Sequence, residues 1–551
     1  MKNTGLRLSV HDRPKMISKM KSEEFDLAII GGGITGAGVA RDAASRGMKV
    51  ALIEGEDFAV GTSSRSSKLI HGGIRYLENY EFHLVFEALS ERALLFDIAP
   101  TLVHPLRFVL PLYNGQRVGM FMMGLGMWAY DALSLFEAPE PHEKLSARES
   151  VARLPLLQPE GLKGSYVYSD AYMDDDRLVH ETLRSAVSLG ATVANRVKAV
   201  DAIFSDGKVT AMVAHDKVSN EKFQIKAKHF VSTVGPWTDS VAVDLLKTWK
   251  KVLRPSKGVH LTFNRSRFDV KDAIVMAADN DKRIVFGIPR HEMFIIGTTD
   301  TDFKGDPKDV SVTKDDVDYL LGVAGHYFPG ANLTKADIVA SYAGVRPLVD
   351  DGSETESKTS REHLIYTDER NMTFVAGGKY TTYRRMALDA VEATLDAFTV
   401  EDRVRFGRPQ TEVPLNPLAS VDRLATARRN IEQYCVATGL PATTVSLLVE
   451  RHASEVDQIL RFDPGPSFSA DERMWTMEAK HAVRETMCDA LVDFFSRRVP
   501  LVLSRADHGL PFVECISKAF QEEIGWSEQE RLRQIQALHD YLKSEFAWRE
   551  G

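Results

Sequence analysis

The sequence predicts an α/β fold: a Rossmann-like dinucleotide-binding domain with an inserted antiparallel sheet, followed by an all-α C-terminal domain. Three observations carry this prediction. An apolar run at 25–30 leads into the glycine-rich turn GGGITGAG, a helix-compatible stretch and a second apolar run at 49–54, which is the pattern of a strand–helix–strand unit. Apolar runs separated by turns over 250–310 favour an antiparallel sheet. Beyond about residue 400, apolar residues recur at helical spacing.

Length and composition limit the classes of protein that need to be considered. At 551 residues, the chain is too long for one core, since domains average roughly 100–200 residues. With 44% hydrophobic and 26% charged residues, it is neither largely disordered nor a bundle of membrane helices. The formal charge of −8 disfavours nucleic acid as a partner. The three cysteines have no paired spacing, so we expect no disulfide scaffold and no metal site.

The domains are expected to be discontinuous along the chain. The first residues are basic and lack an apolar stretch, so they do not form a secretory signal, and we expect a flexible arm. The stretch from about 100 to 165 is rich in proline, which predicts irregular connections around short elements. The expected division is an arm at 1–22, a dinucleotide-binding domain at 23–95, 170–245 and 340–400, a substrate domain at 96–169 and 246–339, and a helical domain at 401–551.

Several local signals place individual elements. A helix is expected from Asp174, with the acidic run Asp174–Asp176 capping it rather than binding a metal. Asp206 and Gly207 predict a hairpin. Ser469 and Glu472 form a capping box that opens one helix reaching Phe494, closed by the basic residues Arg497 and Arg498 before a proline. His481 and Glu485 stand one turn apart, but without a third ligand we interpret them as an ordinary helix face.

The glycine-rich turn has the spacing of a dinucleotide site. Gly31 permits the tight turn, Gly33 lets the backbone approach a pyrophosphate, and Gly36 allows close helix–strand packing. The amides at the start of the helix, at Ile34 and Thr35, would then face the anion. Glu54 ends the next strand, where a carboxylate can accept hydrogen bonds from ribose hydroxyls. A glycine-rich turn without a ligand is the alternative.

A hydroxyl-rich loop follows the second strand. It holds the side chains Thr62, Ser63, Ser64, Ser66 and Ser67. Such a loop can bond a pyrophosphate and lie along the edge of an isoalloxazine ring, which favours a flavin over a nicotinamide dinucleotide. A solvated loop is the alternative.

The motifs from about 25 to 385 resemble the FAD-dependent glycerol-3-phosphate dehydrogenases. The resemblance weakens over 105–165 and over most of the last 150 residues. It implies non-covalent FAD and the oxidation of glycerol 3-phosphate to dihydroxyacetone phosphate. The matching blocks, in family order, are IIGGGITGAG, GTSSRSSKLIHGGIRYLE, SDAYMDDDRL, TVGPW, DKRIVFGIP, IIGTTDTDFKGDP, YAGVRPL and GGKYTTYR.

The proposed chemistry needs a proton acceptor, anchors for a phosphate and a cation near the developing charge. His71 suits the first task, because its ordinary pKa near 6.5 permits proton transfer at neutral pH; a structural histidine is the alternative. The resemblance implies that Arg75 and Arg346 hold the phosphate, which guanidinium groups match bidentately, with Tyr76 as a further donor. Lys379 would stabilise negative charge at the flavin or the substrate oxygen.

The resemblance also implies the contacts to the cofactor. Relatives usually have Ala-Thr-Gly where this chain has Thr233-Val234-Gly235, but the glycine is kept. The expected FAD-binding residues are Gly31, Gly33, Ile34, Thr35, Gly36, Glu54, Thr62, Ser63, Ser64, Ser67, Lys68, His71, Gly72, Gly235, Gly378 and Lys379.

The electron acceptor is expected to be a membrane quinone. In the resembled family, the hydrogen-peroxide-forming oxidases carry a long insertion between the arginine of GVRPL and the lysine of GGK. Here these residues are only 379 − 346 = 33 positions apart, which favours the dehydrogenase over an oxidase using O2. A flavin-binding scaffold without turnover is a third possibility, disfavoured by the intact charged residues.

A quinone acceptor implies peripheral or monotopic contact with the inner face of the cell membrane. The Met-rich segment 119–136 could supply an interfacial surface; a buried core segment is the alternative. A homodimer is left open.

Overall fold

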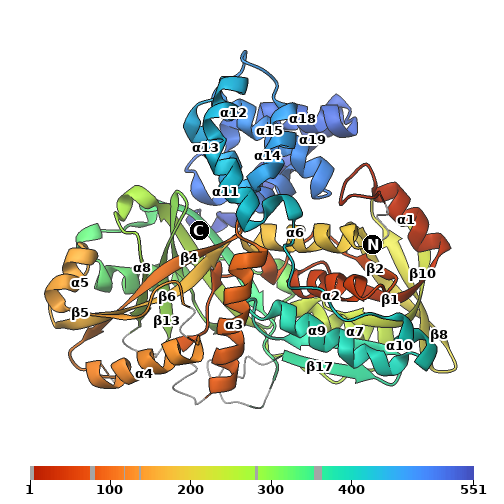
Figure 1. Cartoon of the computed structure of the whole chain (residues 1–551), viewed down its shortest axis with the longest axis horizontal. Helices are drawn as coiled ribbons and strands as arrows, with labels where there is room; N and C mark the ends of the chain where they lie inside the picture. Colours follow the sequence, from red (N-terminus) through yellow and green to blue (C-terminus); the bar gives the residue numbers. More distant parts are fainter. Residues whose placement is uncertain are drawn as a thin grey trace.

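The computed structural model describes residues 5–74, 81–116, 118–135, 138–278, 283–350, 352 and 363–550. Two sheets lie side by side in the lower part of the molecule, and the C-terminal helices lie together above them (Figure 1). The α/β fold with a helical C-terminal part is therefore confirmed, while the boundaries between domains stay a proposal.

The first sheet has the parallel centre that the glycine-rich motif predicts. Its main path runs β17-β18-β10-β1-β2-β7, with β9 pairing to β10 and β8 to β9. The contacts of β1 with β2 and β10 are parallel, as are β2 with β7 and β10 with β18. The strands are β1 (Glu24–Ile30), β2 (Val50–Ile53), β7 (Thr192–Ala194), β8 (Val197–Ser205), β9 (Lys208–Asp216), β10 (Glu221–Ser232), β17 (His363–Asp368) and β18 (Met372–Gly377).

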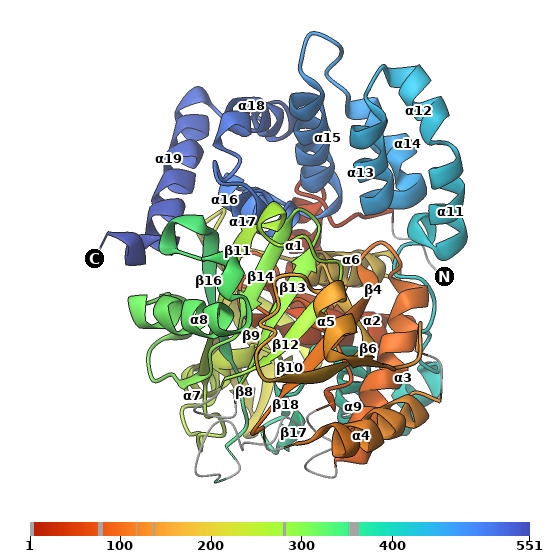
Figure 2. The same cartoon turned by 90° about the vertical axis from the view of Figure 1, so that its left-hand side faces the viewer.

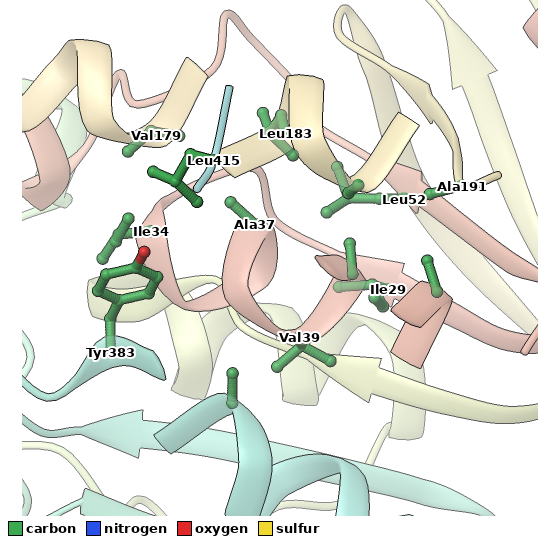
Figure 3. Close-up of a cluster of buried hydrophobic side chains, with 14 of the residues drawn as sticks. Ile29, Ile34, Ala37, Val39, Leu52, Val179, Leu183, Ala191, Tyr383 and Leu415 are labelled. Atoms are coloured by element: carbon green, nitrogen blue, oxygen red, sulfur yellow. The ribbon is translucent and has the colours of Figure 1, made fainter. Parts of the chain in front are cut away.

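Helices of the first sheet bury a continuous apolar core around the glycine-rich turn. Helix α2 (Ile34–Ser45) packs against α6 (Asp175–Ser188) and α9 (Tyr383–Thr394). Small residues make this close packing possible, since Ala37, Ala40 and Ala43 are all fully buried. Figure 3 shows Ala37 and Val39 of α2 among side chains contributed by neighbouring strands and helices. Helices α7 (Thr238–Leu246) and α10 (Val400–Arg405) complete this half.

The second sheet is almost entirely antiparallel, as the turns over 250–310 predict. Its main path runs β15-β11-β14-β13-β12-β4-β6-β3, with β16 on β11 and β5 on β6. Among the strand pairs of the described residues in this sheet, the contact of β12 with β4 alone is parallel. The strands are β3 (Leu69–Ile70), β4 (Val103–Tyr113), β5 (Glu143–Ser146), β6 (Leu162–Met173), β11 (Ser256–Asn264), β12 (Ala273–Ala277), β13 (Ile284–Arg290), β14 (Met293–Gly297), β15 (Thr301–Asp302) and β16 (Ile338–Arg346).

The proline-rich stretch is more regular than the sequence predicts. It contains β4, which pairs with β6 along its whole length although it holds Pro105 and Pro111. On its other side β4 pairs with β12 only at Phe108 and Val109. Both prolines lie outside that short contact, and a strand tolerates proline where no ladder bond is needed. Four helices accompany this sheet: α3 (Phe82–Ile98), α4 (Met120–Leu133), α5 (Ala147–Arg153) and α8 (Lys314–Tyr327).

The C-terminal part is helical throughout the residues described there. We call the C-terminal helices α11 to α19 the cap. Figure 2 shows α11 to α15 on one side of the cap and α18 and α19 on the other. The helices are α11 (Val421–Arg429), α12 (Ile431–Thr438), α13 (Ala442–His452), α14 (Val456–Ile459), α15 (Ala470–Glu485), α16 (Leu491–Asp493), α17 (Leu501–Ser504), α18 (Val513–Ile524) and α19 (Glu528–Glu545).

The long helix expected from Ser469 to Phe494 is two helices. The capping box at Ser469 is present, but α15 ends at Glu485 and Met487 has a left-handed backbone (φ 50). The reason is a long-range interaction that no local pattern reveals. Arg497 and Arg498 do not close a helix in solvent, because both guanidinium groups bind the fully buried carboxylate of Asp57, at 2.8 Å.

The N-terminal segment also differs from the expectation of a flexible arm. Residues Arg13–Ser22 form helix α1, which begins with a proline in its first turn. Its side chains Met16 and Met20 are fully buried, and the guanidinium of Arg13 binds Asp216 at the end of β9 at 2.6 Å. The basic composition therefore conceals an apolar face and a buried ion pair.

Candidate active site

The glycine-rich turn is tightly packed against the strand beside it. Gly31 has φ +108, and a Cβ there would lie 2.8 Å from the carbonyl oxygen of Thr233. A Cβ on Gly36 would lie 1.9 Å from the carbonyl oxygen of Gly31. No other residue type fits these two positions without a backbone shift. Gly33 is the N-cap of α2, so the turn delivers the chain to a helix N-terminus, as a dinucleotide site requires.

Glu54 lies at this turn, in the place expected of the ribose-binding carboxylate. Its Oε2 accepts a hydrogen bond from the amide of Gly32 at 2.7 Å, and its Oε1 accepts one from Glu56 at 2.8 Å. Burial raises the pKa of the Glu54 carboxyl. A Cβ on Gly32 would lie 2.8 Å from the Cβ of Glu54, so carboxylate and turn are in direct contact.

The hydroxyl-rich loop connects the turn to the second sheet. The amide of Ile34 donates to Ser63 Oγ at 3.0 Å. Thr62 Oγ1 donates to the carbonyl of Val345 at 2.6 Å, and Ser67 Oγ lies 2.9 Å from His260 Nε2. Ser64 is buried in the 3-10 turn Thr62–Ser64. The loop is therefore fixed in place rather than solvated, and it lies directly beside the end of β16.

The Lys68 side chain is held by contacts within the protein. Its ammonium is buried, binds Asp175 Oδ1 at 2.5 Å and donates to the carbonyl of Ser64 at 3.2 Å. Ser66 Oγ donates to the other carboxylate oxygen of Asp175 at 2.7 Å. The lysine thus connects the loop to the start of α6.

The Thr-Val-Gly departure has a structural role. Thr233 Oγ1 donates to the carbonyls of Ile30 and Gly31, at 2.9 and 3.2 Å. The threonine hydroxyl therefore fixes the end of β1 and the glycine-rich turn. Gly235 follows with φ +54. The turn stays close to the glycine-rich segment even though the usual residue types are exchanged.

These residues fit a bound dinucleotide. Gly31 and Gly36 leave no room for a Cβ in the turn, Gly33 is the N-cap of the helix that follows, and the Glu54 carboxylate binds the turn at Gly32. Both the anion-binding and the hydroxyl-binding chemistry of a dinucleotide are present.

His71 lies where the second sheet meets the turn after β18. Its main-chain amide donates to Thr381 Oγ1 at 3.2 Å, and Thr381 Oγ1 lies 3.3 Å from the carbonyl oxygen of His71. Thr381 is two residues from Lys379, which is half-buried. Gly378 has φ +85, and a Cβ there would lie 2.4 Å from Met386 Cε. The two loops HGG and GGK are thereby held together through one threonine.

Arg346 ends β16, one residue after the carbonyl that binds Thr62. Its NH2 donates to Thr298 Oγ1 at 2.8 Å and its NH1 binds Asp300 Oδ1 at 3.2 Å. A Cβ on Gly258 would lie 2.4 Å from the guanidinium NH2, so only glycine leaves room for this arginine on β11. Asp300 and Thr298 therefore hold the guanidinium in one orientation. Arg75 and Tyr76 lie outside the described residues.

Three of these residues escaped the sequence analysis. Thr381, Thr298 and Asp300 lie within the blocks GGKYTTYR and IIGTTDTDFKGDP, but neither block by itself says which side chains meet. The available signal was their position, since polar residues directly after buried strands collect at a common edge of a sheet.

The acidic run Asp174–Asp176 does not cap α6 through its first side chain. Asp174 makes no side-chain cap bond; instead its carboxylate binds Arg290 at 2.5 Å and His291 at 3.0 Å. Burial alone would raise the pKa of Asp174, but the charge of Arg290 and, to a smaller extent, His291 hold this pKa well below its usual range. These carboxylates brace α6 against the second sheet.

A second cluster of titratable groups lies in the cap. Ligand atoms of His452, Glu478 and His481 lie within 4.8 Å of one another, and all three residues are buried. Glu478 binds Arg451 at 2.6 Å and His452 at 3.0 Å, while His481 faces Glu455 at 3.2 Å. His481 is therefore part of a buried ionic network, not of the plain helix face that the sequence suggests.

Comparison with known proteins defines the class. A family model described as FAD dependent oxidoreductase matches residues 26–384, and one described as the C-terminal domain of alpha-glycerophosphate oxidase matches residues 420–531. The chain therefore belongs to the FAD-dependent oxidoreductases, and FAD is its dinucleotide cofactor.

Within that class, the chain belongs to the family of aerobic glycerol-3-phosphate dehydrogenases. It is 34% identical to the enzyme of that name from Bacillus subtilis, over 96% of this chain and 97% of the relative. The corresponding enzyme from Staphylococcus haemolyticus is 36% identical over 82% of each chain.

Solved structures agree with this assignment. The glycerol-3-phosphate dehydrogenase from Bacillus halodurans, complexed with FAD, has a TM-score of 0.78 at 30% identity, with 98% of each chain covered. The L-alpha-glycerophosphate oxidase from Mycoplasma pneumoniae has a TM-score of 0.54 at 18% identity over 68% of this chain, which shows a shared fold alone. The resemblance inferred from the sequence motifs is confirmed.

Proposed function

We propose that this protein oxidises glycerol 3-phosphate to dihydroxyacetone phosphate and that its electrons pass to a membrane quinone. One observation carries the proposal: the hydroxyl-rich loop binds the residue before Arg346, and His71 binds the loop that carries Lys379. These contacts bring the segments of His71, Lys379 and Arg346 toward the loop that binds the glycine-rich turn at Ile34, which supports a role for them in one site. The similarity to the Bacillus enzymes supports the choice of substrate.

In this proposal, the chain's residues bind the substrate and handle its proton. Bound FAD, held non-covalently, supplies the acceptor for the hydride that leaves the carbinol carbon. The His71 imidazole takes the hydroxyl proton, so that loss of one hydride and one proton gives the ketone. The Lys379 ammonium stabilises negative charge on the substrate oxygen as that proton leaves. Arg346 binds the phosphate, with Arg75 and Tyr76 as proposed further donors.

The support of Arg346 by Asp300 serves this role. A guanidinium that already lies in one plane loses little rotational freedom when a phosphate binds. The ion pair also leaves the arginine charged, and its fork geometry matches phosphate oxygens. Asp300 therefore acts by orienting Arg346 rather than by touching the substrate.

The test is direct. Purified yellow protein should lose its flavin absorbance when glycerol 3-phosphate is added without oxygen. Glycerol and 3-phosphoglycerate serve as controls. Glycerol lacks the phosphate, and 3-phosphoglycerate has a carboxylate in place of the terminal CH2OH group. Unchanged absorbance with glycerol 3-phosphate would contradict the proposed activity.

A quinone acceptor needs a surface that contacts a bilayer, and α4 offers one. Among the described residues, no helix has both the length and the apolar character needed to cross a membrane. On the outer face of α4, Phe121 is 80% exposed and Trp128 is 62% exposed, with Met122 and Leu125 beside them. We call these four side chains the α4 patch. Aromatic and aliphatic side chains exposed on one helix face are typical of interfacial binding.

The position of the patch fits the same proposal. Helix α4 lies at the edge of the molecule opposite the helical cap, next to α3 (Figure 1). The exposed residues Phe82 and Phe86 of α3 extend the apolar surface. We therefore propose that this edge rests on the inner face of the cell membrane.

Two measurements test the acceptor and the surface. Reduction of a short-chain ubiquinone analogue should exceed peroxide formation from O2 on the same preparation; the reverse would make the protein an oxidase. Flotation with phospholipid vesicles should be lost in Phe121→Ser/Trp128→Ser. The control is Val404→Ser on α10, a residue 81% exposed elsewhere, which should float like the parent.

A further inference from the structure

The α4 patch and the active-site loop are connected through the same helix. The inner face of α4 buries Met127, Tyr130 and Asp131. The hydroxyl of Tyr130 accepts a hydrogen bond from the amide of Gly72 at 3.0 Å. Gly72 directly follows His71. Tyr130 is two positions after Trp128 of the patch, so one short helix contacts both solvent and the loop of His71.

The hydroxyl belongs to a buried network that reaches three elements. Tyr130 Oη donates to the carboxylate of Asp170 on β6 at 2.8 Å, and Asp170 Oδ1 also accepts from Gly72 at 3.2 Å. The guanidinium of Arg92 on α3 binds the same oxygen at 2.6 Å. Burial raises the pKa of Tyr130 well above its ordinary value, so this hydroxyl keeps its proton and remains a donor to Asp170.

The contact is sterically tight. A Cβ on Gly72 would lie 2.5 Å from Tyr130 Oη and 2.5 Å from Leu89 Cδ2. Because α4 touches Gly72 with no intervening space, a displacement of α4 changes the environment of the His71–Gly72 peptide. Thr381 Oγ1 binds the same peptide at its other end, donating to the carbonyl of His71 at 3.3 Å. The loop of His71 and Gly72 is therefore held between the network around Tyr130 and the loop of Lys379.

We propose that Tyr130 is a positioning residue: its hydroxyl fixes the Gly72 amide and hence His71, and it transmits the docking of the α4 patch to the catalytic loop. The rate effect rests on the proposed function, whereas the positioning of the loop does not. A helix that is covered on its outer face by lipid has less freedom to move away from Gly72, so lipid binding increases the fraction of molecules with His71 in place.

Tyr130→Phe removes only the hydroxyl and keeps the ring. We expect amide hydrogen exchange in segment 69–74 to become faster, because Gly72 loses one of two acceptors. The limiting rate of flavin reduction by glycerol 3-phosphate should fall by about tenfold, with flavin content and KM near the parent's. The pH dependence of that rate should also shift, which a purely structural role would not produce.

Tyr168→Phe is the matched control. Tyr168 is buried on β6 with its ring 5.6 Å from that of Tyr130, and no described hydrogen bond joins it to Gly72. It should leave exchange in 69–74 and the rate unchanged. Equal exchange and equal rates for Tyr130→Phe and the parent would overturn the positioning role. If Tyr130→Phe fails to fold, Asp170→Asn tests the same network, with the same expectations.

Vesicles of phosphatidylglycerol test the coupling. They should raise the parent's rate by about fivefold, the lower range of ordinary coupling, and slow exchange in 69–74, but do neither in Tyr130→Phe. Vesicles that bind the parent and change neither quantity would overturn the coupling. A parent whose flavin is not reduced by glycerol 3-phosphate would instead contradict the proposed function, and the exchange measurements would still decide the present inference.

Discussion

The dinucleotide end and the substrate end of this site are built in different ways. At the first, the main chain provides the shape: Gly31 and Gly36 are positions where a Cβ would meet a carbonyl oxygen. At the second, side chains from distant segments provide it, since Arg346 is oriented by Asp300 and His71 lies between Thr381 and the Tyr130 network. A backbone-built site can be recognised from spacing alone, whereas a side-chain-built site becomes visible only when the chain is folded.

The comparison predicts that changes at the substrate end lower the rate without releasing flavin. His71→Asn should reduce kcat on the order of 10²–10⁴-fold, because it removes the proposed proton acceptor. Flavin content should stay at the parent's level, since His71 binds Thr381 through its main chain. Steady-state kinetics and the flavin-to-protein absorbance ratio check both parts. A loss of less than tenfold would return His71 to a structural role.

Arg346→Ala should have the next largest effect. Removing one partner of a desolvated charge pair costs roughly 2–5 kcal/mol in transition-state binding, measured as a fall in kcat/KM for glycerol 3-phosphate. Lysine at this position should recover only part of the loss, because it cannot bind a phosphate bidentately. A kcat/KM near the parent's in Arg346→Ala would remove this residue from the site.

A buried histidine of the second sheet should make the stability of the protein sensitive to acid. Burial lowers the pKa of His104 on β4 to about 4. Between pH 6.5 and about 4, the unfolded chain protonates this histidine and the folded chain does not. The free energy of unfolding therefore falls as the pH drops through that window, by at most about 3 kcal/mol from this group.

His104→Gln should flatten this pH dependence in urea unfolding measured from pH 7 to 4. His83→Gln is the control, because His83 is exposed on α3 and should leave the slope as it is. Identical slopes in His104→Gln and the parent would show that this histidine does not contribute.

At the dinucleotide end, Gly36→Ala should release flavin. A Cβ there would lie 1.9 Å from a backbone oxygen, and overpacking of this kind costs typically about 1–3 kcal/mol. Gly322→Ala is the matched control, because Gly322 lies in helix α8 with open space around it. This substitution should stabilise the protein slightly. The melting temperature and bound flavin check both. If Gly36→Ala keeps its full flavin content, the main chain at this glycine does not shape the dinucleotide site.

Sequence patterns predicted most of the fold because its elements carry local signals. The glycine-rich turn, the helix from Asp174, the hairpin at Asp206 and the capping box at Ser469 are all present. The failures at the N-terminal segment and at the end of the helix from Ser469 share one cause. Burial of Arg13, Arg497 and Arg498 depends on carboxylates hundreds of residues away, and no local pattern encodes such a partner.

The candidate site divides along the same line. The tight glycine turn follows β1 and is in contact with Glu54 after β2, as the spacing of the motif predicts. Lys68 instead turns its ammonium to Asp175, and Asp300 and Thr381 were not identified at all. Asp300 and Thr381 lie within recognised motifs, but their contacts form only when strand ends and loops from distant segments come together. A motif does not say which of these side chains will be in contact.

The buried pairing of Asp57 with Arg497 and Arg498 has a consequence for how this chain can change over time. Asp57 belongs to the cofactor half and both arginines to the cap. Losing Asp57 would deprive two buried guanidinium groups of this partner, at a cost of about 3–5 kcal/mol. A substitution at Asp57, Arg497 or Arg498 therefore weakens the contact between the two halves, so we expect changes at these positions to occur together.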